Sequence, residues 1–201
     1  MDDSQVFLKV WKNALELVNA RGYTYEQKYD TINEEEMKHL ISNNGLFIMG
    51  EKKSSKILIK LVTISKVKSV NIKEIVAEIV DELKDSNCSF EIIIILKNKP
   101  TSIIKKLEKD KEYANLQIMY TKQFMFNPTK HSLVPKHTKL PEDEINDIVK
   151  YYALSSKNQL PIILKDDAIV RYYNFKPGDV IKIESTVGTM NTNYLYYRCV
   201  R

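Results

Sequence analysis

The sequence predicts an α+β protein of two domains, an N-terminal α/β domain over residues 1–128 and a small C-terminal α+β domain over residues 129–201. Strand and helix patterns alternate through the first part, as in a sheet with helical crossovers. Three prolines then interrupt residues 127–141, where no helical period is found. A helix and several short strands follow. The proline-rich segment is therefore the expected domain boundary.

Two amphipathic helices open the chain. Apolar residues recur at helical spacing over residues 4–21, with Ser4 as a candidate N-cap and Gly22 as a stop. A second, shorter helix is expected over residues 31–42. Both patterns are typical of helices that pack one face on a core.

The rest of the N-terminal domain alternates strands and helices. The stretch "FEIIIIL" at 90–96 is apolar throughout, which favours a strand covered on both faces. Asn71 is the candidate cap of the helix before it. The expected order is strands at 45–51 and 56–65, a helix at 71–86, a strand at 90–96, a helix at 102–114 and a strand at 116–124.

The C-terminal domain is predicted to hold one helix and a few short strands. The helix, at 140–154, has Pro141 at its start and acids in its first turn, as the helix dipole prefers. "KPGD" at 176–179 is a turn. The expected strands lie at 160–164, 168–175, 180–185 and 194–200.

Composition excludes several classes of protein. With 201 residues, 43% of them hydrophobic, the chain is long enough for one sizeable core or two small ones and too apolar for disorder. The longest apolar runs are far shorter than a membrane span, and the acidic N-terminus has no signal core. We therefore expect no membrane partner. Cys88 and Cys199 form no spacing pattern, which favours a reducing compartment.

The charge is mildly basic and unevenly distributed. The net charge is +5, which permits contact with nucleic acid without arguing for it. No acid occurs between Glu112 and Glu142, although four lysines do.

The acid-free window contains the stretch "HSLVPKHTKLP" at 131–141, which raises several alternatives. A metal site on His131 and His137 lacks a third ligand and the i, i+4 spacing of helical zinc motifs. Apolar and amphipathic residues beside lysines suit an extended segment lying on another surface. Each histidine is also a candidate for a structural role, bonded to backbone groups.

Catalytic patterns are incomplete. The sequence has no serine elbow, no reactive-cysteine signature and no Gly-rich phosphate loop. A restriction-nuclease-like site needs an acid in one strand and an acid–x–Lys in the next. Glu91 stands alone, and Glu51–Lys52–Lys53 falls in a predicted turn. A stand-alone metal-dependent nuclease stays an alternative, as does a free basic DNA-binding module. We expect no catalytic residue, metal or cofactor.

The segment "KNKPTS" between the strand at 90–96 and the next helix is a candidate phosphate contact. Thr101 or Ser102 can cap the helix, whose first amides then point outward. Four lysines surround the place: Lys97, Lys99, Lys105 and Lys106. Such a contact would hold a DNA backbone without reading sequence. A solvated basic loop is the alternative.

Residues 131–201 resemble the fifth subunit of eukaryotic DNA-dependent RNA polymerases, and the same module is similar to the small archaeal RNA polymerase subunit that corresponds to it. The motifs that carry the resemblance are dispersed and in the family's order: "HSLVPKH", "QLP", the Tyr172 region, "GDV" at 178–180 and a closing "YR". In the N-terminal part, "VWKNALELVNARGYTY" and "KNKPTSIIKKL" also resemble the eukaryotic subunit.

The resemblance implies a non-catalytic subunit of a transcription complex. In this family the C-terminal module is the assembly domain, which binds the largest polymerase subunit. The N-terminal domain is a restriction-nuclease-like fold without the active site and forms part of the lower jaw, near downstream duplex DNA. A two-domain chain implies a eukaryote or a large DNA virus, and the looser N-terminal similarity favours a virus. The expected location is the nucleus for a cellular chain, and the virion or a cytoplasmic viral factory for a viral one.

Carried onto this sequence, the resemblance assigns two groups of residues. Residues expected to bind a partner subunit are His131, Leu133, Val134, Pro135, Lys136, His137, Gln159, Leu160, Pro161, Tyr172, Gly178 and Arg198. Residues expected near DNA are Lys97, Lys99, Pro100, Thr101, Ser102 and Lys105.

The sequence departs from the family pattern in two places. Ala168 follows Asp167 where the family commonly has proline, which questions the local turn. The arginine that the family commonly has near Glu184 is absent, which removes a positive charge from that surface.

Overall fold

The chain folds into two compact units, Met1–Phe126 and Asn127–Arg201. The computed structural model describes residues 2–43, 45–83, 88–187 and 192–201. The boundary lies two residues before the expected one. We describe each unit by itself.

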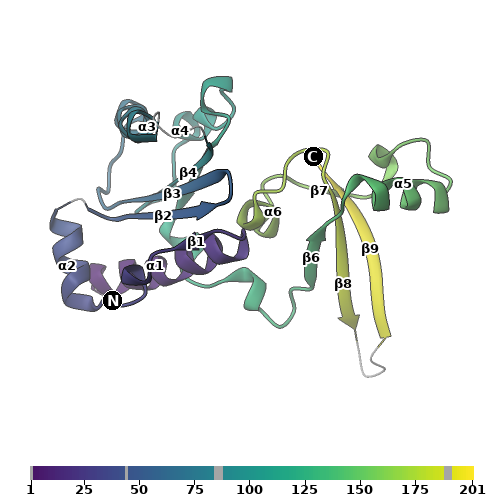
Figure 1. Cartoon of the computed structure of the whole chain (residues 1–201), viewed down its shortest axis with the longest axis horizontal. Coiled ribbons are helices and arrows are strands. Elements are labelled where there is room, and N and C mark those ends of the chain that lie inside the picture. Colours follow the sequence, from purple (N-terminus) through teal and green to yellow (C-terminus); the bar gives the residue numbers. More distant parts are fainter. Residues whose placement is uncertain (1, 44, 84–87, 188–191) are drawn as a thin grey trace. The chain divides into compact units, whose positions relative to one another are not determined.

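The N-terminal unit is built on a five-stranded mixed sheet (Figure 1). Its strands, in spatial order, are β1 (Thr24–Tyr25), β2 (Phe47–Lys52), β3 (Ser55–Val62), β4 (Ser89–Leu96) and β5 (Leu116–Tyr120). The first two pairings are antiparallel and the last two are parallel. The parallel strands follow from the sequence, because a helix separates each from the next.

Helices cover both faces of this sheet. In Figure 1, α1 and α2 lie on one side and α3 and α4 on the other. The bounds are α1 (Asp3–Ala20), α2 (Glu34–Ser42), α3 (Ser69–Leu83) and α4 (Ser102–Leu107), with 3₁₀ turns at Gln27–Tyr29, Lys111–Tyr113 and Thr121–Phe124. The interior strand β4 is consequently buried from Ile92 to Leu96, as its apolar run predicted.

Helix α1 packs closely on β2. A Cβ at Gly50 would come within 2.8 Å of Val18 Cγ1 and 2.9 Å of Ile57 Cγ2, so glycine is required there by space. The buried Trp11 donates its indole N–H to the carbonyl of Tyr29 at 2.9 Å. These contacts fix the helix on the sheet and leave no buried indole N–H unsatisfied.

Several sequence expectations in this unit are wrong. Ser4 does not cap the first helix, whose N-cap is Asp2. Glu51 and Lys52 lie in β2, not in the turn expected there, and the strand expected over 116–124 ends at Tyr120.

Two of the expected helices also differ. Asn71 does not cap its helix, which begins at Ser69; its side chain instead accepts from the backbone N–H of Lys68 at 3.1 Å. The helix expected over 102–114 ends at Leu107. Asp110 bonds the N–H of Glu112 and starts a 3₁₀ turn, since aspartate competes for local backbone groups.

The C-terminal unit has a four-stranded sheet in the order β6-β8-β9-β7. The strands are β6 (Lys136–Lys139), β7 (Ile162–Ile163), β8 (Val180–Val187) and β9 (Thr192–Val200), the helices are α5 (Glu142–Tyr151) and α6 (Ala168–Tyr173), and 3₁₀ turns lie at Pro128–Lys130 and Lys157–Gln159. The loop expected between the last two strands falls largely at 188–191, outside the described residues.

The expected strand at 168–175 is wrong, because these residues form α6. Asp167 caps the helix, its Oδ1 accepting from the N–H of Ile169 at 2.8 Å and of Val170 at 3.4 Å. Asn174 ends it in the left-handed region with φ 55°. The two caps outweigh the strand-like run of β-branched and aromatic residues between them.

The two faces of the β8–β9 hairpin bury separate apolar clusters. Val180 and Ile181 are both fully buried although they point to opposite faces. One cluster contains Leu140, Ile145, Leu160, Val180 and Cys199, and the other contains Ile163, Val170, Ile181, Ile183 and Val200. Helix α5 contributes to the first and helix α6 to the second, so the sheet is covered on both sides around Val180 and Cys199, whereas Tyr194 and Leu195 farther along β9 are exposed.

Candidate functional site

The segment 131–141 lies mostly on the surface of the C-terminal unit. Leu133 is 84% exposed, the most exposed large apolar residue among those described. Val134 and Pro135 are half-buried, and His131 and Lys136 are exposed. Only Leu140, near the end, enters a core cluster. A single exposed apolar residue is common on protein surfaces, but here the half-buried Val134 and Pro135 follow it directly, which makes the segment a candidate binding surface.

Both histidines of this segment bond backbone groups. The Nδ1 of His131 accepts from the N–H of Leu133 at 3.2 Å, and the carbonyl of His131 accepts from the N–H of Val134 at 2.9 Å. The Nδ1 of His137 lies 2.7 Å from the carbonyl of Pro135. The imidazoles therefore hold the turn that presents Leu133.

The segment then joins the sheet as the edge strand β6. Lys136 pairs with Glu184 in the register, and its Nζ lies 3.8 Å from the Glu184 carboxylate. Lys182 approaches the same carboxylate at 2.9 Å. The hydrogen bond from Lys182 holds the pKa of Glu184 below its ordinary value, with both lysine charges acting in the same direction. Positive charge thus surrounds Glu184 even without the family's arginine.

The second family strip, 159–161, has both exposed side chains, those of Gln159 and Pro161, and bonds within the unit. Gln159 accepts from the N–H of Ser155 at 2.6 Å, and Leu160 is buried. The carbonyl of Pro161 accepts from the N–H of Cys199 at 2.8 Å. These residues tie the segment after α5 to the last strand.

The remaining expected partner residues also have internal contacts. Tyr172 is buried, and its hydroxyl accepts from the Asn127 amide at 3.0 Å. Gly178 has φ 91°, and its N–H donates to the carbonyl of Val200. Arg198 donates to the carbonyl of Ile162 at 2.9 Å. The structure therefore separates the exposed strip around Leu133 from residues that hold the unit together.

The expected DNA-proximal loop lies at the carboxyl ends of β3 and β4. Lys99, Thr101 and Ser102 are exposed, whereas Pro100 is buried. Thr101 stands at the N-cap of α4 without a side-chain cap bond. Lys105 is exposed on the helix. The loop and the helix that follows it thus expose two lysines and two hydroxyl side chains.

Lys97 differs from the other lysines of this loop. Its Nζ donates to Asp3 Oδ2 at 2.6 Å, and its side chain is largely covered. Its carbonyl accepts from the Thr121 hydroxyl at 2.7 Å. Lys97 therefore joins the loop to the start of α1, and its charge is already paired.

A second loop, which no sequence pattern indicated, completes this surface. Asn98 donates its side-chain amide to the carbonyl of Ser65 at 3.0 Å, joining the loop after β4 to the loop after β3. The two loops surround a hollow of about 280 Å³ with Lys66 and Lys99 among its walls. The parallel pairing of β3 and β4 could have indicated that the two loops meet. Loops that follow parallel strands lie at the same edge of the sheet.

Glu91, the isolated acid of the nuclease alternative, is held by an arginine. Arg21 donates to Glu91 at 2.8 Å and to the side-chain Oε1 of Gln117 at 2.8 Å, with only 4% of its side chain exposed. The hydroxyl of Tyr23 lies 3.3 Å from the same carboxylate. Burial raises the pKa of Tyr23, and Glu91 adds to the rise. A carboxylate neutralised in this way is a poor ligand for a divalent ion.

No metal centre is found in the part of the chain that the structure describes. There, no group of three or more His, Cys, Asp or Glu side chains is placed to hold an ion. Within the same residues, no helix has the length and apolarity of a membrane span. The nuclease alternative gains no support from the described residues.

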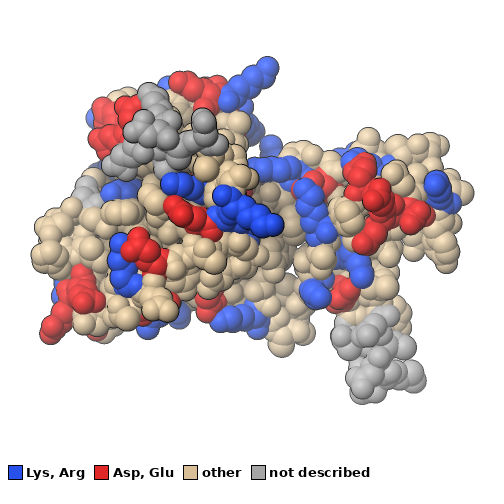
Figure 2. Space-filling view, in the orientation of Figure 1, with Lys and Arg blue, Asp and Glu red and all other residues tan. Residues whose placement is uncertain are grey.

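Charge on the molecular surface is mixed. Figure 2 shows lysines and arginines interspersed with acids, and a concentration of acids over α5. Glu142, Asp143 and Glu144 form the first turn of that helix. A surface of this kind does not provide the single-sign field of a dedicated nucleic-acid binder.

The described residues thus place an exposed leucine on a turn held by internal hydrogen bonds, in a small unit with its own apolar clusters. Residues 126–200 match the family model described as RNA polymerase Rpb5, C-terminal domain. The chain belongs to the family of fifth subunits of DNA-directed RNA polymerases.

Similarity to curated proteins extends beyond the C-terminal unit. Subunit 5A of Arabidopsis thaliana DNA-directed RNA polymerase V is 33% identical over 137 residues, which is 68% of this chain and 58% of that protein. The Dictyostelium discoideum subunit rpabc1 of DNA-directed RNA polymerases I, II and III is 26% identical over the full length of both chains. Subunit 5B of Arabidopsis RNA polymerases IV and V is 28% identical over 131 residues, which is 65% of this chain and 57% of that protein.

Proposed function

We propose that this chain is a non-catalytic subunit of a multisubunit DNA-directed RNA polymerase, held on the largest subunit by its C-terminal unit. The observation that carries the proposal is the family match over 126–200, which coincides with the compact unit Asn127–Arg201. The N-terminal unit has the role of a restriction-nuclease-like jaw domain without an active site. The location that follows is the nucleus for a cellular chain, and the virion or a viral factory for a viral one.

The strip around Leu133 is the proposed docking surface. Leu133 is exposed, while His131 accepts from its backbone N–H and His137 bonds the carbonyl of Pro135 two residues later. A preorganised apolar anchor loses little entropy on binding, and its burial removes apolar area from water. The exposed Lys136 would then lie at the polar rim of the interface.

Charged substitution tests this docking surface. Leu133→Asp combined with Val134→Asp should abolish incorporation into the polymerase, because two charges would be buried without partners. Incorporation is measured by co-purification with the largest subunit, and folding by thermal unfolding of the variant alone. Thr138→Asp, at an exposed position of β6, is the matched control and should incorporate normally. Normal incorporation of the double variant would rule out docking through this strip.

The second part of the proposal is a contact between the N-terminal unit and the backbone of downstream duplex DNA. Lys99, Lys105 and Lys66 are exposed around the two joined loops. Lysines of this kind attract phosphates without reading bases, and the attraction weakens as salt rises. Lys97 instead stabilises the loop through its ion pair with Asp3.

Charge reversal at Lys99 and Lys105 tests the DNA contact. The double change to Glu should shorten retention of downstream DNA by the assembled polymerase at low salt and have little effect at high salt. Lys12→Glu, an exposed lysine on α1, should leave retention unchanged. Lys97→Glu is kept separate, since it also breaks the pair with Asp3. Unchanged retention at low salt in the Lys99/Lys105 variant would remove this part of the proposal.

A further inference from the structure

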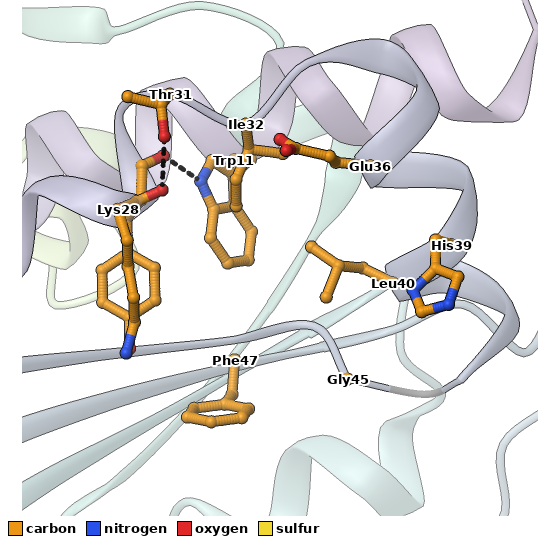
Figure 3. A pocket seen from close by; sticks show the side chains of 10 residues that line it. Trp11, Lys28, Thr31, Ile32, Glu36, His39, Leu40, Gly45 and Phe47 are labelled. Carbon is orange, nitrogen blue, oxygen red and sulfur yellow. Dashed lines mark hydrogen bonds between the residues drawn. The ribbon is translucent and has the colours of Figure 1, made fainter.

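A second hollow lies in the N-terminal unit, between α1, α2 and the start of β2. Its volume is about 440 Å³, within the range of sites that bind organic groups. Figure 3 shows Trp11, Ile32, Leu40 and Phe47 around one open space, with Lys28, Glu36 and His39 at its edge. Phe47 is 43% exposed, and its side chain stands at the margin of the hollow. None of these residues belongs to the surfaces proposed above.

Two polar groups of the wall, one buried and one exposed, are already bonded within the unit. The Trp11 indole N–H donates to the Tyr29 carbonyl at 2.9 Å, and the Thr31 hydroxyl donates to the Lys28 carbonyl at 3.1 Å (Figure 3). Small-molecule sites usually offer a few convergent polar groups that orient the ligand. Here an entering group would meet mainly aromatic and aliphatic surface. This favours an apolar side chain, whose orientation is set by the rest of its own chain.

Charge around the hollow indicates the character of the rest of the partner. Residues 26–39, which supply most of the wall, carry five acids against two lysines, although the whole chain has a net charge of +5. Glu34, Glu35 and Glu36 form the first turn of α2, and Figure 2 shows acids over this helix. Lys28 is paired with Glu26 at 2.6 Å. The surroundings of the hollow therefore attract positive charge and repel nucleic acid.

We propose that this hollow, which we call the Trp11 pocket and define by Trp11, Tyr29, Ile32, Leu40 and Phe47, binds a basic peptide segment of a partner protein through one or two large apolar side chains. The apolar anchor would fill the pocket, and flanking lysines or arginines would face the acids of α2. An anchor in a pocket with a charged rim is the usual arrangement of a binding hot spot.

Selection from random peptides identifies the preferred occupant without assuming a partner. A phage-displayed library of random peptides is selected on the full chain. The proposal expects enrichment of peptides that combine Phe, Leu or Trp with flanking Lys or Arg. Enrichment of acidic or purely polar peptides, or of none, would overturn it.

Fluorescence then locates the binding. Because Trp11 is only 2% exposed, the readout is the fluorescence anisotropy of a labelled selected peptide, which should rise in a saturable way as the chain is added. Phe47→Asp should weaken the selected peptides about thirtyfold, the size of a lost hot-spot contact. Val70→Asp, at an exposed apolar residue of α3 outside the pocket, should bind as the unchanged chain does. If Phe47→Asp does not fold, Phe47→Ala takes its place.

A charge variant and two competing occupants complete the test. Glu35→Lys, at an exposed position, should weaken binding at low salt and have a smaller effect at high salt.

Equal binding by Phe47→Asp and the unchanged chain would contradict the proposal. Saturable binding of free naphthalene with no selected peptide would assign the pocket to a small apolar ligand. Dimerisation of the chain that Phe47→Asp abolishes would assign it to a second copy.

Discussion

At the scale of single residues, the structure gives internal partners to several side chains whose types suggested chemistry. Glu91 is bonded to Arg21, and both histidines of the strip bond backbone groups. Lys97, expected near DNA, is paired with Asp3, 94 positions earlier in the sequence. Pairings between residues so far apart depend on the tertiary fold, so sequence spacing could not have predicted them. The alternative of structural histidines was open from the sequence, because imidazole readily bonds backbone groups.

Removing Glu91 should destabilise the N-terminal unit. Glu91→Ala leaves the buried Arg21 guanidinium without its carboxylate. We expect the free energy of unfolding to fall by about 2 kcal/mol. This is less than the loss for a fully buried pair, because Glu91 is partly exposed. The measurement is urea-induced unfolding. The double variant Arg21→Met with Glu91→Leu should recover part of the loss, since no charge then stays unpaired. The nuclease alternative would instead require metal-dependent cleavage of plasmid DNA that Glu91→Ala abolishes.

Glu184 provides a prediction on pH. Because its folded-state pKa is lowered by Lys182, its contribution to stability is present above the unfolded-state value and is lost as the pH falls through the lower folded-state value. NMR titration of the Glu184 carboxyl should give a midpoint below 4.5. Lys182→Met should raise that midpoint toward the ordinary value. An unchanged midpoint would mean that the hydrogen bond from Lys182 does not form in solution.

At the scale of elements, sequence patterns predicted long regular segments well and short ones poorly. The helix over 4–21 and the strand over 90–96 are present because their apolar periods extend over many residues. Residues 168–175 were predicted as a strand, although Asp167 and Asn174 cap a helix there. A six-residue helix has too few turns to show a period, so its caps were the better signal.

The cap of α6 is testable. Asp167→Ala removes two bonds to the first helical amides and should cost about 1 kcal/mol of stability in thermal unfolding. Ala168→Pro restores the family's usual residue at the first helical position, where proline is tolerated because that N–H has no partner within the helix. We therefore expect this variant to unfold at the same temperature or higher. A marked loss in Ala168→Pro would mean that the start of α6 differs from that described.

The contact between α1 and β2 provides a second element-scale prediction. Gly50→Ala places a Cβ within 2.9 Å of Val18 and Ile57, which forces the helix and sheet apart. We expect a loss of about 1–3 kcal/mol, typical of an overpacked core, in urea unfolding. Gly45→Ala is the matched control, because its Cβ would meet Leu40 at an ordinary 3.5 Å. Equal stability of the two variants would show that α1 does not press on Gly50.

At the scale of the whole molecule, the two units carry different candidate surfaces. The C-terminal unit exposes Leu133 beside its small sheet, and the N-terminal unit has two joined basic loops. The family, the order of most elements and the candidate docking strip could be predicted from the sequence, because the motifs are dispersed along the chain in a fixed order. The joined loops and the Trp11 pocket could not, since each brings together segments that are distant in sequence. They depend on the parallel pairing of β3 with β4 and on the packing of α1 against the sheet.

The central claim is that this chain works while bound to a larger polymerase subunit, and affinity purification from its native source tests it most directly. A tagged chain should elute together with the largest RNA polymerase subunit in equal amounts, and Leu133→Asp with Val134→Asp should elute without it while remaining folded. Elution of the unchanged, folded chain without any polymerase subunit would contradict the account.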